Sequence, residues 1–288
     1  MYWFLLSLGS ALSKSLADMT SKKVLEKMGK LVVGCISRGM VAFAALVFVF
    51  FQGIPSIGPG FWKAVLITGA INVVTTLLSL RSLQEGELSL VAPMLALSPI
   101  FLLITSPIIT NQFPSFWGLV GILLSVSGIY TMKVQETRLG WSEPFKAIWR
   151  SAGVKDALLV AFLYSISANY DSIAANSSSP FFTILMVNTF IFLCLFIPAL
   201  NQPGLWRLTK ENFKGLSLMS VFMASETGFQ FTAFQHAIVP YVISVKRSSA
   251  LLSVLWGRQF FEENKEFVSR LAGVAIVIAG LVIIKLFG

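Results

Sequence analysis

Charged residues are scarce in this chain of 288 residues: only 12% are Asp, Glu, Lys or Arg, whereas 56% are hydrophobic. The mean hydropathy is +0.79. A soluble domain usually carries about 25% charged residues, and its helices need polar faces. This shortage of polar surface excludes a water-soluble globule. We therefore expect an integral membrane protein, with the lipid bilayer as its partner.

Histidine and cysteine are also rare. The chain has one His, and its two cysteines, Cys35 and Cys194, lie inside apolar stretches. The positions of the cysteines argue against a structural disulfide or a metal site. With one His, the sequence offers no metal-ligand cluster and no candidate Ser-His-Asp triad for catalysis. We expect no enzyme activity, no cofactor and no metal. No basic residue precedes the first apolar run, so we expect a retained helix rather than a secretory signal.

Ten stretches are suitable for crossing a bilayer, which takes roughly 20 mainly apolar residues. Some are short or interrupted; they are about Tyr2–Thr20, Leu31–Phe51, Phe61–Leu83, Leu88–Ile109, Phe116–Met132, Lys155–Ala174, Phe181–Leu200, Phe213–Gln235, Tyr241–Phe261 and Phe267–Phe287. The longest polar break, 134–153, mixes aromatic and basic residues, as is typical of a segment in the headgroup region. We predict one membrane domain with halves 1–133 and 154–288 and an amphipathic linker, 134–153.

The two halves resemble each other at an offset of about 150 residues. The matching segments are "GILLSVSG" (121–128) with "GVAIVIAG" (273–280), "VAPMLALSP" (91–99) with "VISVKRSSA" (242–250), and "ALSKSLADMTS" (11–21) with "AFLYSISANYD" (161–171). A duplicated helical unit in lipid is the layout of a secondary transporter, with its site between the halves. Glycines seven apart predict close packing, either between the two repeats or in a dimer. The chain is therefore expected to be a monomer or a homodimer.

The fourth stretch holds three prolines, Pro93, Pro99 and Pro107. Proline removes a backbone donor, so this helix is expected to be kinked or partly unwound. The ninth stretch has no proline at the equivalent places, which predicts an asymmetric break. A broken helix can mark a transport site or be a packing kink alone.

Basic residues are divided unequally between the two sides of the predicted membrane. The loops after odd-numbered helices hold 16 of them, and the other side holds two, Lys63 and Lys285. The 16 are Lys22, Lys23, Lys27, Lys30, Arg81, Lys133, Arg138, Lys146, Arg150, Lys155, Arg207, Lys210, Lys214, Arg258, Lys265 and Arg270. Basic loops favour the cytoplasmic face. The net charge of +9 thus predicts orientation, with odd-numbered loops cytoplasmic, and not nucleic-acid binding.

Charges inside spanning segments cost about 2.5–3.5 kcal/mol each on insertion scales, so each needs a reason. Lys246 and Arg247 are adjacent and are followed by Ser248 and Ser249. One interpretation is an anion-binding site, because Arg offers a planar fork and Lys a point charge. The other is snorkelling together with a structural ion pair.

Two acids lie deep in the predicted helices. Glu226 is the acid nearest to mid-membrane; it could couple transport to protons or neutralise Lys246 or Arg247. Asp171 is expected on the same side as these two cations, as their counter-ion.

Lys14 and Arg38 are about equally deep from the basic face. By the repeat offset they correspond to Tyr164 and Asn188. Two pseudo-symmetric polar pairs, reached from opposite faces, would suit alternating access. Snorkelling of Lys14 and Arg38 towards the cytoplasm is the alternative.

The order and spacing of "VAPMLALSP", "KRSSALLSVLWG…FFEE" and the paired glycine segments resemble the drug/metabolite transporter superfamily, EamA type. The resemblance implies ten helices in two inverted five-helix repeats, a central cavity and secondary transport of metabolites. It also implies cytoplasmic termini, opposite to the distribution of basic residues, although the superfamily contains members of both orientations. The adjacent Lys246 and Arg247 are similar to the phosphate-binding pair of plastid sugar-phosphate translocators of the same superfamily.

The expected function is therefore secondary active transport of a small anionic or zwitterionic, amino-acid-like metabolite in the cell (inner) membrane. Coupling to protons is one of the two roles considered for Glu226. The alternatives within transport are exchange of phosphorylated compounds and flipping of an anionic lipid. A non-transporting membrane assembly protein is the alternative from another class.

Overall fold

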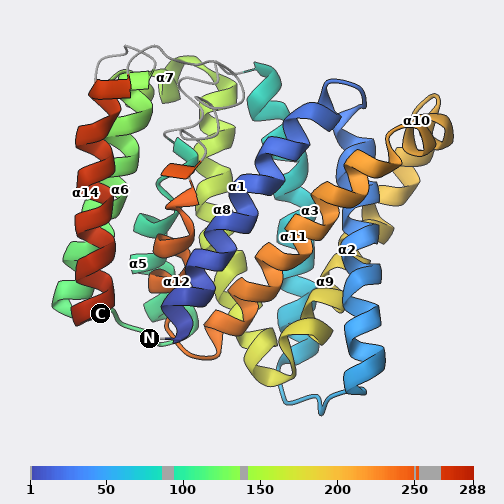
Figure 1. The fold of residues 1–288 in the computed structure, drawn as a ribbon, viewed down its shortest axis with the longest axis horizontal. Helices are drawn as coiled ribbons and strands as arrows, with labels where there is room; N and C mark the ends of the chain where they lie inside the picture. Colours follow the sequence, from blue (N-terminus) through green and yellow to red (C-terminus); the bar gives the residue numbers. More distant parts are fainter. Residues whose placement is uncertain (1, 86–93, 137–141, 250, 253–266) are drawn as a thin grey trace. The chain divides into compact units, whose positions relative to one another are not determined.

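The computed structural model describes residues 2–85, 94–136, 142–249, 251–252 and 267–288, and the regular structure within these ranges is helical (Figure 1). The helices are α1 (Tyr2–Leu25), α2 (Lys30–Gln52), α3 (Phe61–Glu85), α5 (Ser98–Ile109), α6 (Phe116–Glu136), α7 (Glu143–Arg150), α8 (Ala152–Ser177), α9 (Pro180–Leu200), α10 (Leu205–Glu211), α11 (Phe213–Phe234), α12 (Val239–Lys246) and α14 (Phe267–Phe287). The predicted all-α class is confirmed for the described ranges.

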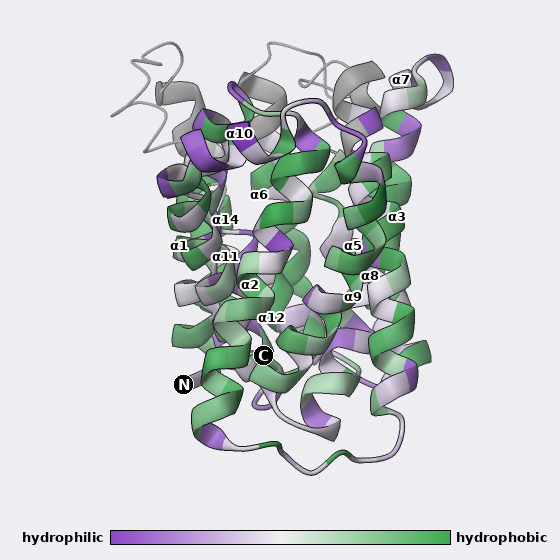
Figure 2. Ribbon diagram, turned by 90° about the vertical axis from the view of Figure 1, so that its right-hand side faces the viewer, coloured by the Kyte–Doolittle hydropathy of each residue, from purple (hydrophilic) through white to green (hydrophobic). Residues whose placement is uncertain are grey.

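Four helices of the described chain are long and apolar enough to cross a membrane: α2, Phe61–Ser79 of α3, α8 and α9. Shorter apolar helices are α5, Phe116–Thr131 of α6 and Gly273–Phe287 of α14. Hydrophobic residues cover most of α2 and α9 in Figure 2. The chain is therefore an integral membrane protein by composition and by helix length.

The chain divides into two compact units. The first, which we call the N-terminal unit, comprises Tyr2–Val73 and Tyr170–His236; the second, the C-terminal unit, comprises Val74–Asn169 and Ala237–Gly288. Each is built from chain segments that lie far apart in the sequence.

In the N-terminal unit, α1 and α11 pack side by side and run in opposite directions (Figure 1). Gly9 lies against the ring of Phe229 near one end of the pair, and Val24 lies against Gly215 near the other. A glycine on each helix lets the two backbones approach closely in an apolar environment.

Helices α2 and α9 form a second antiparallel pair in this unit. The rings of Phe48 and Phe181 stack with their centroids 4.7 Å apart. Ser179 caps α9 by accepting a hydrogen bond from the backbone N–H of Phe182 (3.2 Å), and Pro180 occupies the first turn. Serine at the cap and proline just inside it are the usual signals for a helix start.

In the C-terminal unit, α6 and α14 pack against each other through glycines (Figure 1). A Cβ atom on Gly121 would lie 2.8 Å from the carbonyl oxygen of Gly280, and one on Gly128 would lie 2.7 Å from that of Gly273. Larger residues would force these backbones apart. The packing role expected of the paired glycines is confirmed, and it joins two helices of one chain.

The fourth and ninth predicted stretches are both interrupted. The chain turns at Ala96–Leu97 before α5, and it turns again at Arg247–Ser248 after α12. These positions coincide when "VAPMLALSP" is aligned with "VISVKRSSA", so the prediction of an asymmetric break is wrong. Proline accounts for only one break: Pro99 starts α5, whereas α12 ends without a proline, where Ser248 and Ser249 offer the backbone alternative hydrogen bonds.

Some helices differ from the predicted stretches in length or were not predicted. Helix α1 continues to Leu25 instead of ending near Thr20, so Asp18 lies well inside it. The short helix α10 was not predicted, and α7 occupies part of the predicted linker. The rest of the ninth stretch, 253–261, lies outside the described residues.

Candidate functional site

Arg247 of the C-terminal unit connects the two interrupted stretches. Its Nε and one terminal nitrogen donate hydrogen bonds to Ser98 Oγ at 3.0 and 2.6 Å. Arg247 follows the last residue of α12, and Ser98 is the first residue of α5. The guanidinium of Arg247 therefore lies where α12 ends and α5 begins, inside the predicted membrane region. Helix ends leave backbone groups without intrahelical partners.

The other predicted polar residues of this unit surround the same turn or lie on α8. Lys246 and Ser249 are partly buried, and Ser248 is buried. Tyr164 is partly buried on α8. It precedes a buried polar network in which Thr105 Oγ1 lies 3.2 Å from both Ser165 Oγ and Asn169 Nδ2.

Helix α12 is also held at its start by a residue near the end of α5. The side-chain oxygen of Gln112 accepts a hydrogen bond from the backbone N–H of Val239 at 3.0 Å. Because α5 and α12 pack together, this contact and the one between Arg247 and Ser98 fix both ends of α12 relative to α5.

Arg38 and Asn188 of the N-terminal unit are in direct contact. A terminal nitrogen of Arg38 on α2 donates to Asn188 Oδ1 on α9 at 3.1 Å, across 150 residues of sequence. Asn188 is buried and Arg38 is partly buried. The structure thus brings together two residues that the repeat offset made equivalent.

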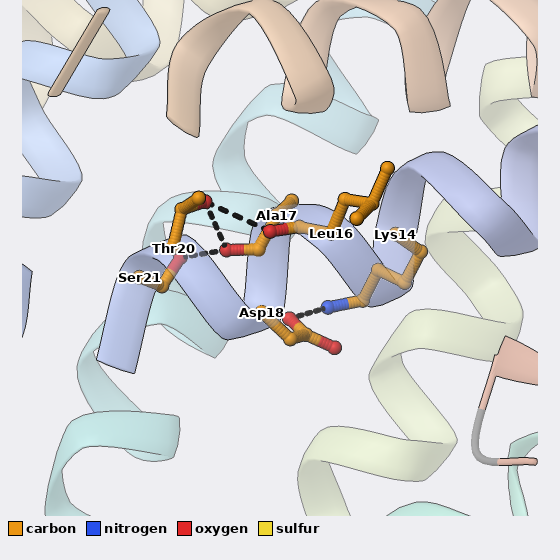
Figure 3. Close-up of polar contacts among 6 residues, drawn as sticks. All are labelled: Lys14, Leu16, Ala17, Asp18, Thr20 and Ser21. Carbon is orange, nitrogen blue, oxygen red and sulfur yellow. Dashed lines mark hydrogen bonds and ion pairs between the residues drawn. The ribbon is translucent and has the colours of Figure 1, made fainter. Parts of the chain in front are cut away.

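Lys14 forms an ion pair with Asp18, one turn later on α1 (Figure 3). Thr20 and Ser21 donate to backbone carbonyl oxygens of the same helix, including that of Ala17. Asp18 follows Lys14 by four residues on the same helix, and its carboxylate balances the charge of Lys14.

The two deep acids are both buried in the N-terminal unit. Asp171 on α8 accepts a hydrogen bond from Thr68 Oγ1 of α3 at 2.6 Å, and Asn72 Nδ2 lies 3.1 Å from the same hydroxyl. The backbone carbonyl of Glu226 on α11 accepts from Ser10 Oγ of α1 at 3.0 Å. These contacts place each acid beside a polar residue of a neighbouring helix.

Several partners were not identified from the sequence, notably Ser98, Asp18 and Thr68. Ser98 had a usable signal, since it directly precedes Pro99 and aligns with Ser249 in the other half. Thr68 had none, because its role depends on the register between α3 and α8. In the described residues, no group of three or more His, Cys, Asp or Glu could hold a metal ion.

Comparison with known proteins gives one family and one fold. The sequence profile of the EamA-like transporter family matches residues 1–133. No curated protein matches the chain. A protein crystal structure superimposes with a TM-score of 0.77 at 13% identity, covering 99% of this chain and 96% of that chain. At this identity, the likeness establishes the fold alone.

The family resemblance expected from the sequence is therefore confirmed. Residues 1–133 match the EamA-like transporter family, which is part of the drug/metabolite transporter superfamily.

Proposed function

We propose that this protein is a secondary active transporter that moves a small anionic or zwitterionic metabolite across the cell membrane by alternating access. The observation that carries the proposal is the paired interruption at Ala96–Leu97 and Arg247–Ser248. Transporters place substrate sites at discontinuous helices in corresponding positions of two repeats, because free backbone groups there can contact the substrate.

The proposed architecture has ten spanning helices in two inverted five-helix repeats, 1–133 and 154–288, joined by the linker 134–153. Two contacts support it. Gly121 faces Gly280, and Gly128 faces Gly273. In the alignment of the halves, Gly280 is the equivalent of Gly128, and Gly273 is the equivalent of Gly121. This reciprocal pattern is what a two-fold relation between antiparallel helices produces. The contact between Arg38 and Asn188 fits the same relation.

The substrate is proposed to be anionic or zwitterionic because cations converge at the junction in the C-terminal unit. Arg247 lies beside the N-terminus of α5, and Lys246 precedes it in the chain. The backbone N–H groups and the dipole at this end of α5 also favour an anion. A carboxylate can replace Ser98 as the acceptor of the two N–H groups that form this fork of Arg247. We assign Ser248, Ser249 and Tyr164 to the same site, and Lys14, Arg38 and Asn188 to the substrate-binding polar residues of the N-terminal unit.

Coupling to protons is proposed to involve Glu226, with Asp171 as a counter-ion. Both are buried carboxyl groups in a protein that presents apolar helices to the bilayer. An acid in such surroundings is a candidate proton carrier.

Exchange of phosphorylated compounds is the second candidate function. The adjacency of Lys246 and Arg247 favours it, since a point charge beside a planar fork suits a phosphate group. The first experiment therefore tests amino acids, dicarboxylates and phosphorylated metabolites together.

The experiment measures thermal stabilisation of the purified protein by this panel, followed by uptake of each stabilising compound into proteoliposomes. A substrate at about 100 times its Kd should add about 2.7 kcal/mol to the free energy of unfolding. Arg247→Ala should abolish both the thermal stabilisation and the uptake. Arg207 on α10 has an exposed side chain, so Arg207→Ala should preserve both. A folded Arg247→Ala protein with normal uptake would contradict the site, and a panel without any transported member would contradict the function.

A further inference from the structure

A groove lies between α1, α2, α9 and α11 of the N-terminal unit and has a volume of about 570 Å³. Its lining is mainly apolar and includes Val41, Ala45 and Phe48 of α2 together with Phe181 and Ile184 of α9. Sites for small molecules usually have volumes of about 300–1,000 Å³. In size and lining, the groove suits a hydrocarbon chain.

The groove opens beside apolar side chains. Phe48, Val221 and Phe229 line it and are exposed. Phe43 and Phe50 continue the exposed apolar surface of α2, which is one of the helices able to span a membrane. Exposed apolar residues on a spanning helix face the acyl chains of lipids, so a chain can enter the groove from the bilayer.

A guanidinium group lies on the same helix faces, one turn beyond this lining. Arg38 precedes Val41 by three residues on α2, and Asn188 follows Ile184 by four on α9. Residues three or four apart share a helix face. Within the described chain, Arg38 has one hydrogen bond, to the neutral amide of Asn188, and no ion pair.

This arrangement leaves most of the hydrogen-bonding capacity of the Arg38 guanidinium unused. A guanidinium has five N–H donors, and a partly buried charge in a spanning helix is costly unless it is compensated. An anionic group beside Arg38 and Asn188 would supply both the charge and the acceptors.

We propose that the groove binds a long-chain carboxylate from the bilayer, with its alkyl chain along α2 and α9 and its carboxylate on Arg38 and Asn188. The fork of Arg matches a carboxylate. Arg38 lies about 12 Å of helical rise from the first residue of α2, which favours a compact carboxylate over a bulky phospholipid headgroup. This ligand comes from the lipid phase and is not the carried metabolite. It would compete with the metabolite for Arg38 and Asn188, so the inference deepens the binding role proposed above for this pair and rests on it.

The experiment uses a palmitate probe with a diazirine near the far end of the chain, added to the full-length protein in nanodiscs. We expect crosslinks to peptides that contain Ala45–Phe48, Phe181–Ile184 or Gly228. Arg38→Gln should weaken binding about tenfold or more, as expected for the loss of a hydrogen bond to a charged group. The methyl ester of the probe, which has no carboxylate charge, should bind more weakly by a similar factor.

A second variant fills the groove without a clash at its Cβ. A Cβ on Gly228 would have its nearest neighbour, Phe181, at 3.7 Å, so Gly228→Leu should fold and lose the crosslinks. Phe50→Leu, on the exposed side of α2, should retain them. Crosslinks outside the groove, equal binding of the ester, or displacement of the probe by a phospholipid of equal chain length would overturn the inference.

The two proposals fail in different ways. Lost metabolite transport in Arg38→Gln with unchanged probe binding would overturn the carboxylate site and leave the transporter standing. Normal probe binding in a protein that transports no compound would do the reverse.

Discussion

The hydroxyl of Ser98 joins two helix ends that are almost 150 residues apart in the sequence. It accepts two hydrogen bonds from Arg247 and is itself buried. Hydrogen bonds to charged groups contribute about 1.5–3 kcal/mol. At the scale of single residues, this contact has the largest expected effect on the junction between α5 and α12.

Ser98→Ala should therefore lower the free energy of unfolding by about 1.5–3 kcal/mol, because the guanidinium of Arg247 loses an acceptor inside the bundle. Ser127→Ala is the matched control, since Ser127 is exposed and donates only within its own helix, to Leu123. Unfolding in detergent, followed by circular dichroism, measures the difference. A double-mutant cycle with Arg247→Ala should show coupling between the two residues; additive effects would argue against the contact.

Glu226→Gln should make uptake independent of an imposed pH gradient, because the amide cannot bind and release a proton. The measurement is substrate uptake into proteoliposomes at two external pH values. Glu211→Gln on α10, where the acid is exposed, should leave the response unchanged. If Glu226→Gln keeps the full response, Glu226 neutralises a nearby cation and does not couple transport to protons.

At the scale of helices, the close packing of α6 against α14 requires glycine at the points of contact, because glycine has no side chain. A Cβ on Gly280 would lie 2.6 Å from the carbonyl oxygen of Gly121 and 2.7 Å from the backbone nitrogen of Ser125. Backbone atoms cannot yield as the end of a flexible side chain can. Overpacking of this kind usually costs about 1–3 kcal/mol.

Gly280→Ala is thus expected to lower the melting temperature of the purified protein. Gly228→Ala makes the same chemical change inside α11, where the nearest neighbour of the added Cβ is the ring of Phe181 at 3.7 Å, and it should have little effect. Equal melting temperatures for both variants would show that α6 and α14 do not pack this closely.

Helix pairs also show what can be predicted from sequence. The glycine pattern predicted the packing of α6 and α14, because small residues at a fixed spacing signal close contact. The break after α12 was missed, because it has no proline and depends on Arg247 reaching another helix. The ion pair of Lys14 was missed, although Lys14 and Asp18 are four residues apart within the predicted stretch Tyr2–Thr20 and so share a helix face. Thus periodicity and spacing predicted the helices, whereas contacts that depend on register between helices were not predictable.

At the scale of the whole molecule, orientation is the property for which two lines of argument disagree. The 16-to-2 division of basic residues predicts that the odd-numbered loops are cytoplasmic and that both termini are outside. The family resemblance implies the reverse. We retain the orientation predicted from charge, because it rests on this sequence.

A C-terminal alkaline phosphatase fusion should therefore be active in a bacterial host, and a C-terminal green fluorescent protein fusion should be dark. Fusions within the linker 134–153 should give the opposite pair of results. Fluorescence at the C-terminus together with an inactive phosphatase would reverse the orientation and leave the fold unchanged.

The hydrogen bond between Arg38 and Asn188 also bears on how such a chain can arise. If the halves descend from one duplicated segment, these residues began as identical copies at the same site. Two arginines would then have repelled each other inside the membrane, whereas two asparagines could have bonded amide to amide. One copy therefore had to change before a cation could be accommodated at this position. Divergence between the halves is thus a requirement of the chemistry at this contact, and not only a product of time.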